Sequence, residues 1–180
     1  YQDRPGLVSL VAFFRPPSSS WSERRYHEAL WHILQFLHVH DPEPWPDAIP
    51  TDPDDSRWEF CFGGAPIFPT CRAPFYTERP SRYCPIGLEI TFQPRTLFAG
   101  ITHDTTAGAE AREQIQGRIV EYDGQQPHPD LGYWGVSGDR EWKQYLFRED
   151  QAQAPETCPI TVSRDHPKPA TNLEMLLADG

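Results

Sequence analysis

Residues 86–92 read IGLEITF, and this alternation of apolar and polar side chains predicts a β-strand with one buried face. The residues expected on the buried face are Leu88, Ile90 and Phe92. Residues 57–63 (RWEFCFG) alternate in the same way. Their apolar side consists of Trp58, Phe60 and Phe62. Two such strands lying side by side predict a sheet whose aromatic face packs against another layer.

The flanking segments predict helices and further strands. Apolar residues at helical spacing predict a helix from a capping box at Ser20 to about His38, and another over residues 105–122 that ends at Gly124. The buried stripe expected on the second helix is Ala111, Ile115, Ile119 and Tyr122. Residues 6–15, a continuous apolar run, predict a buried strand, and residues 141–147 predict a fourth strand.

The remaining segments predict irregular backbone. Residues 65–85 are rich in proline and aromatic side chains, residues 94–100 suggest a helical turn, and residues 172–177 suggest a short helix. Strands and helices do not alternate in a βαβ rhythm, so we expect the α+β class, with a mainly antiparallel sheet and two main helices. We expect one domain over residues 1–180; the chain starts at Tyr1 rather than Met, which leaves room for residues upstream.

Composition excludes several classes of function. The chain has 180 residues, a net charge of -10 and a pI of about 5.1, which disfavours binding to nucleic acid or to an anionic membrane. No apolar run approaches the roughly 18 residues that span a bilayer, and the start lacks the apolar segment of a signal peptide. The four cysteines show no CxxC pair or zinc-ligand spacing, so we expect reduced thiols in a cytoplasmic protein.

Four short blocks combine polar groups with aromatic or proline neighbours. They are residues 81–83 (SRY), 92–95 (FQPR), 128–132 (HPDLG) and 141–145 (EWKQY). The P-loop, GxGxxG, GxSxG and HExxH signatures are missing from the sequence. Rigid neighbours hold a polar side chain in place, so these blocks are the best candidates for a preorganised site.

In this order, with Tyr122-Asp123 between FQPR and HPDLG and Glu149-Asp150 at the end, the blocks resemble the YqcI/YcgG family. The resemblance is close over residues 81–150 and extends more loosely to the WEFCFGG stretch. HPDLG followed by EWKQY is its most specific part. A Pro-Cys element that we associate with the family does not occur before Gly6, and residues 68–71 (FPTC) match it only superficially.

The resemblance implies a haem protein that uses dioxygen to hydroxylate a guanidino nitrogen of arginine or a related compound. The implied partners are haem b, the guanidino substrate, dioxygen and an electron donor or reductase; a homodimer remains open. Two other classes also remain open: a non-catalytic haem carrier or sensor, and a cofactor-free module that binds a small molecule.

A haem iron needs a ligand from His, Cys, Tyr or Met. His128 is the first candidate, because the prolines on both sides restrict its backbone. The alternatives are His103 and Cys71, followed by Cys84 and His166.

Further residues are candidates for contacts with haem or substrate. The cations expected to bind the haem propionates are Arg82, Arg95 and Lys143, and Trp134 is expected to pack against the macrocycle. A guanidinium substrate needs a carboxylate partner. The candidates for this role are Glu89, Glu59 and Glu141, with Asp130 as a further alternative.

Overall fold

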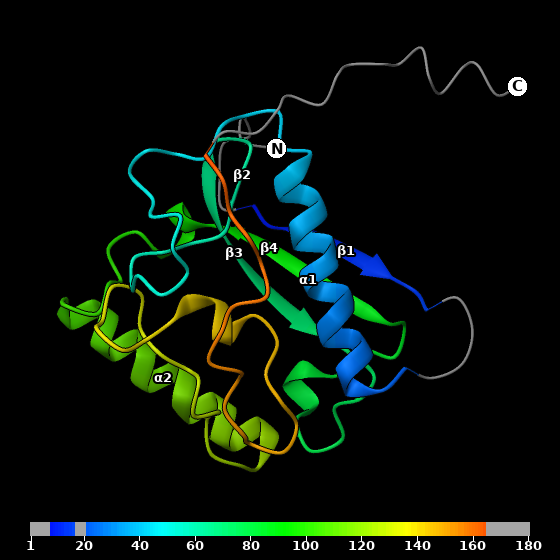
Figure 1. Cartoon of the computed structure of the whole chain (residues 1–180). Coiled ribbons are helices and arrows are strands. Elements are labelled where there is room, and N and C mark those ends of the chain that lie inside the picture. The colour runs from blue at the N-terminus through cyan, green and yellow to red at the C-terminus, as the bar shows by residue number, and fades with distance from the viewer. Residues whose placement is uncertain (1–7, 17–20, 165–180) are drawn as a thin grey trace, which may run out of the picture.

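A computed structural model describes residues 8–16 and 21–164 of the chain (Figure 1). Its strands are β1 (Leu10–Phe14), β2 (Cys61–Phe62), β3 (Ala65–Arg72) and β4 (Leu88–Pro94). Its helices are α1 (Glu23–Val39), α2 (Thr106–Asp123) and the short 3-10 helices η1 (Pro80–Arg82), η2 (Arg95–Phe98) and η3 (Glu141–Gln144). The helix expected at residues 172–177 lies outside the described residues.

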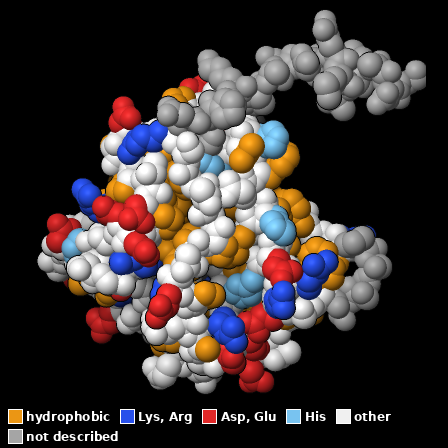
Figure 2. Space-filling view, viewed as in Figure 1, with side chains coloured by type: hydrophobic (Ala, Val, Ile, Leu, Met, Phe, Trp, Pro, Cys, Tyr) orange, Lys and Arg blue, Asp and Glu red, His pale blue; other side chains and the backbone are white. Residues whose placement is uncertain are grey.

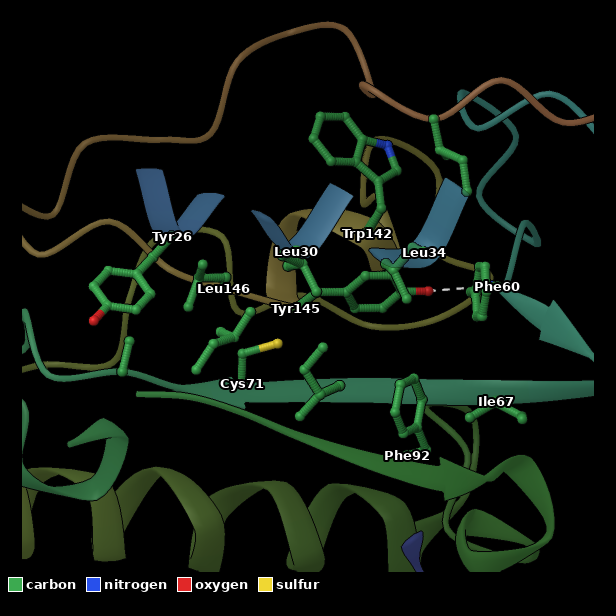
Figure 3. Packing of buried hydrophobic residues seen from close by; sticks show 14 of the residues in the cluster. Tyr26, Leu30, Leu34, Phe60, Ile67, Cys71, Phe92, Trp142, Tyr145 and Leu146 are labelled. Atoms are coloured by element: carbon green, nitrogen blue, oxygen red, sulfur yellow. Dashed lines mark hydrogen bonds between the residues drawn. The ribbon is translucent and has the colours of Figure 1, made fainter. Parts of the chain in front are cut away.

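The four strands form one antiparallel sheet in the order β1-β4-β3-β2. The long helices lie on opposite faces of this sheet, α1 on one and α2 on the other (Figure 3). The predicted α+β fold with two main helices is therefore confirmed. α1 begins at Glu23 with Ser22 as its N-cap, two residues later than the capping box at Ser20 predicts.

The core lies between α1 and the sheet (Figure 3). α1 contributes Tyr26, Leu30 and Leu34, and β4 contributes Leu88, Ile90 and Phe92. Full burial of one such side chain stabilises a fold by about 1.5–3 kcal/mol. The core face predicted for residues 86–92 is confirmed, because all three of its apolar side chains are buried.

The prediction of irregular backbone over residues 65–85 is wrong for its first part, which forms β3. The prolines suggested that no strand could form here. Pro69, however, occupies a position of β3 whose backbone nitrogen points away from β4, so its missing N–H does not affect pairing with β4. The N–H groups of Ile67 and Cys71, on either side of it, donate away from β4, to the carbonyl oxygens of Phe60 and Tyr145. Pro69 faces the same way and therefore leaves the β3–β4 ladder intact.

Two predicted strands are also wrong in extent or type. Only Cys61 and Phe62 of residues 57–63 are in a strand, although Trp58 and Phe60 are buried as expected. Residues 141–147 contain η3 in place of a strand. Almost every side chain of that segment is buried, so the alternation of a half-buried strand is missing.

Two segments expected to be buried are exposed. β1 lies at the edge of the sheet, where Leu10 is 51% and Phe13 is 52% exposed. On α2 only Gly108 is buried, and the expected stripe residues Ile115 and Tyr122 are 48% and 68% exposed. α2 therefore lies beside the sheet without packing tightly on it.

On the face of the molecule seen in Figure 2, hydrophobic side chains are visible near the centre, and acidic and basic side chains gather toward the edges. Within the described residues, neither long helix has the length and hydropathy needed to cross a bilayer.

Candidate functional site

A hollow of about 730 Å³ separates α2 from the second face of the sheet. Strand alternation places Phe68 and Thr70 of β3 and Gln93 of β4 on this face, opposite the core. α2 closes the hollow with Ala111, Ile115 and Ile119. These are apolar residues of the stripe that sequence periodicity predicted to be buried, and they face a cavity.

α2 is fixed at both ends. Near its start, a Cβ on Gly108 would lie 1.8 Å from the carbonyl oxygen of Thr102, so only glycine permits this close approach. At its end, the Asp123 carboxylate accepts hydrogen bonds from the N–H and the hydroxyl of Ser81, at 2.8 and 2.7 Å. The middle of α2 therefore spans the hollow.

A buried ion network lies at one end of the hollow. The Arg95 guanidinium bridges the carboxylates of Glu59 and Glu141, whose side chains are 3% and 1% exposed. The Tyr145 hydroxyl donates to Glu141 Oε1 at 2.9 Å and accepts from the Phe60 N–H at 3.2 Å. Among these residues, Arg95 and Glu141 line the hollow, and Glu59 lies behind Arg95.

The network carries more negative than positive charge, because two carboxylates share one guanidinium. Burial raises the pKa of Glu59 above its usual value, and the nearby Arg95 opposes this rise. A second cation at this end of the hollow would therefore be attracted to the carboxylates.

The other end of the hollow adjoins a smaller cavity of about 340 Å³. Arg82 lines both cavities, and Arg79 and His128 line the smaller one. The Arg82 guanidinium lies 4.6 Å from the centre of the Phe147 ring, and its Nη1 donates to the Cys71 carbonyl at 3.3 Å. The two cavities together form a space that is acidic at one end and basic at the other.

His128 is fixed inside the protein. Its ring stacks on Phe147 with the ring centres 4.5 Å apart, and its Nδ1 accepts a hydrogen bond from the Asp130 N–H at 3.1 Å. Burial, together with Arg79 and Arg82, lowers the pKa of His128 to about 4, against smaller opposing effects of Asp150 and the Ala152 carbonyl. The neutral ring therefore carries its proton on Nε2.

The structure brings together several of the residues predicted from sequence. Arg82, Arg95, Trp134, Glu141 and His103 line the hollow. The Arg95 guanidinium lies 5.4 Å from the Trp134 ring, so these two form one wall.

Other predicted residues lie elsewhere. Cys71 points into the core on the α1 side of the sheet (Figure 3), and burial raises the pKa of its thiol. Glu89 is paired with Arg72. Lys143 lines a separate cavity of about 660 Å³ beside α1.

Asp130, the further carboxylate candidate, is buried and accepts a hydrogen bond from the Ala154 N–H at 2.7 Å. His166 lies outside the described residues. Among the residues that the structure describes, no cluster of three or more His, Cys, Asp and Glu side chains could hold a metal ion.

Arg79 was not predicted. It lies in a proline-rich segment without strand or helix periodicity, so nothing in the sequence pattern places it beside a cavity. Arg112, on α2, was missed for another reason. Its guanidinium lies 3.6 Å from the centre of the Tyr133 ring, and a contact between residues so far apart in the chain has no signal in the local sequence.

Comparison with known proteins gives several relatives. Two are from Bacillus subtilis (strain 168): "Uncharacterized protein YqcI", 38% identical over 85% of this chain and 61% of that protein, and "Uncharacterized protein YcgG", 37% identical over 91% and 65%. A third, from Streptomyces lavendulae, is named "Putative N(omega)-hydroxy-L-arginine synthase DcsA" and is 34% identical over 84% of this chain and 57% of that protein.

The chain thus spans roughly six tenths of the length of these relatives. No solved structure matches it. The model of the YqcI/YcgG family matches residues 1–161, which include the described strands and both long helices. The chain therefore belongs to the YqcI/YcgG family.

Proposed function

We propose that the chain carries the site of an N-oxygenase, which hydroxylates a guanidino nitrogen of arginine or a related small molecule with haem b as cofactor. The observation that carries this proposal is the 34% identity, over 84% of the chain, to the protein named "Putative N(omega)-hydroxy-L-arginine synthase DcsA". The hollow beneath α2 is where we place the reaction, because it combines an apolar cavity with buried carboxylates.

The residues around the hollow fit a flat, largely apolar cofactor. Its volume of about 730 Å³ falls within the usual range of ligand sites, and its lining includes Phe68, Phe98 and Trp134. Arg82 lies at the end where the smaller cavity begins, in a position to bind a propionate. When bound, haem supplies the activation of dioxygen.

The geometry favours His103 as the iron ligand over the other candidates. His103 lines the hollow, and no described residue is hydrogen-bonded to its ring. His128 would have to move its proton from Nε2 to Nδ1 before Nε2 could bind iron, and the Asp130 N–H opposes this change. Cys71 points to the other face of the sheet (Figure 3).

We assign the binding of the substrate guanidinium to Glu141. Its carboxylate lines the hollow, and with Glu59 it already holds one guanidinium, that of Arg95. A substrate guanidinium placed alongside would share this excess negative charge. The roles of Arg95 and Tyr145 are to position the Glu141 carboxylate.

The reaction balances with an external donor of two electrons. One oxygen atom of dioxygen forms the new N–O bond, and the other leaves as water after taking up two electrons and two protons. A reductase or a small reductant supplies the electrons. The residues of the hollow bind and orient the guanidino group and exclude bulk water.

The test is an absorption spectrum of the protein with haem supplied, followed by mass spectrometry of L-arginine incubated with ¹⁸O₂ and a reductant. We expect a Soret band that shifts or disappears in His103→Ala but persists in His128→Ala and in the control Lys143→Ala. The expected product is N-hydroxyarginine that contains one ¹⁸O atom.

Other outcomes point to other functions. A Soret band without product from any guanidino compound would indicate a haem carrier or sensor. Failure to bind haem would refute the oxygenase and leave a cofactor-free binding module. Loss of the band in His128→Ala alone would move the iron ligand to His128.

A further inference from the structure

Arg79 is a buried cation without a partner for most of its guanidinium. The residue is 2% exposed and lines the smaller cavity. Its Nε and Nη2 atoms are buried and make no hydrogen bond with any described residue. A guanidinium taken out of water without a partner destabilises a fold, so its presence at a cavity calls for a ligand.

Arg82 adds a second cation to the same cavity. Its guanidinium contacts the Cys71 carbonyl and the Phe147 ring, and no carboxylate oxygen of the described residues lies within salt-bridge distance of Arg79 or Arg82. Arg72, the third arginine of the lining, is already paired with Glu89. Asp123 is the one carboxylate of the lining, and both of its oxygens accept hydrogen bonds from Ser81, so the Arg79 and Arg82 guanidinium groups have no ion-pair partner among the described residues.

His128 presents a hydrogen-bond donor there. Because its Nδ1 accepts from the Asp130 N–H, the proton is on Nε2, which is buried; the Ala152 carbonyl lies close to the ring, but it does not form a well-aligned hydrogen bond with Nε2. Neutral imidazole and the two guanidinium groups thus offer only donors.

The segment that carries Arg79 and Arg82 is held firmly. Asp123 binds the N–H and hydroxyl of Ser81, and Glu149 Oε1 accepts from the N–H groups of Thr77 and Glu78 at 2.6 Å each. The donors are therefore preorganised without a ligand.

We propose that the cavity lined by Arg79, Arg82 and His128 binds a carboxylate of the molecule that fills the adjoining hollow. Arginine binds carboxylates through two parallel hydrogen bonds, and Arg79 offers Nε and Nη2 for such a pair. The carboxylate belongs either to an amino-acid substrate or to a haem propionate. The assignment of the carboxylate to a substrate or to haem rests on the proposed function. The binding of a carboxylate in this cavity does not.

The first experiment tests carboxylate binding alone. Thermal unfolding is measured in 100 mM sodium acetate and in sodium chloride of equal ionic strength, with acetate as the probe. A dissociation constant of about 10 mM would raise Tm in acetate by about 4 °C relative to chloride. We expect this rise to be lost in Arg79→Met and kept in the matched control Arg148→Met, an arginine that pairs with Asp150 away from the cavity.

The second experiment identifies the source. L-Arginine is compared with agmatine, which lacks only the carboxylate, and haem b with its dimethyl ester. In one of these pairs, we expect the compound with the free carboxylate to bind the parent at least about tenfold more tightly than its partner without it. Arg79→Met should bind both compounds of that pair with equal affinity. Arg82→Met serves as the second variant if Arg79→Met does not fold.

Equal Tm values in acetate and chloride, or an acetate effect that persists in both arginine variants, would overturn the proposal. Equal affinity within both pairs would overturn it for the ligand of the hollow. Failure of the proposed function looks different: neither haem nor guanidino compounds would bind, but acetate would still stabilise the parent.

Discussion

Replacement of Arg95 by methionine should strongly destabilise the protein. The change leaves the Glu59 and Glu141 carboxylates, both almost fully buried, without their shared cation. Loss of one partner of a buried ion pair typically lowers the free energy of unfolding by about 3–5 kcal/mol. For a chain of this size, this corresponds to a fall in Tm of about 10 °C.

The loss should depend on pH in a defined direction. Burial raises the pKa of Glu59 above the unfolded value, and removal of Arg95 eliminates the influence that opposes this rise. An acid whose pKa is raised by folding destabilises the folded state above that pKa, and the effect disappears as pH falls toward the unfolded value. The difference between parent and Arg95→Met should therefore be large at pH 8 and smaller at pH 5.

Urea unfolding followed by circular dichroism at both pH values measures this difference. Arg57→Met is the control, since Arg57 is exposed and its one ion pair within the described part of the chain is with Asp55; it should change stability little. Adding Glu141→Gln to Arg95→Met should restore part of the loss. A loss below about 1 kcal/mol at pH 8, or an equal loss at pH 5, would refute the view that Arg95 compensates two buried charges.

Three further results are expected. Gly108→Ala should lower Tm by several degrees, because the new methyl group would lie 1.8 Å from a backbone oxygen. Gly117→Ala, in the same helix but with open space around it, should raise Tm slightly, and thermal unfolding of both variants checks this. Acidification from pH 6.5 to 4 should destabilise the parent, because burial lowers the pKa of His27 and His128 to about 4 in the folded protein. As pH falls, these histidines are protonated in the unfolded chain before they are protonated in the folded one, which favours unfolding. A urea midpoint that stays constant across this range would contradict the prediction. Tyr145→Phe should reduce the free energy of unfolding by about 1–3 kcal/mol, since its buried hydroxyl makes two hydrogen bonds; an unchanged urea midpoint would count against their importance.

The parts of the fold that sequence could predict are those where one periodicity dominates. Leu88 and Ile90 alternate with polar residues because one face of β4 is buried, and α1 shows a helical stripe for the same reason. β3 escaped prediction because the effect of Pro69 depends on which way its nitrogen points, and local sequence does not record that direction.

The site was predictable as a set of residues but not as an arrangement. Arg95 and Glu141 were assigned to different ligands, and the structure pairs them with each other. They are 46 positions apart, so only the return of the chain at η3 brings them together. Arg79 had no signal at all, since its importance comes from burial without a partner.

α2 is held at its two ends and carries apolar side chains over an open space. Any molecule that fills this space takes the place of the core that the second layer lacks. Its binding energy then adds to the folding energy of the whole protein, by about 2.7 kcal/mol when the ligand is present at a hundred times its dissociation constant. A ligand in this space would cover the apolar stripe of α2, whose periodicity predicted burial against protein, and the melting temperature would then rise with the fraction of protein that is loaded.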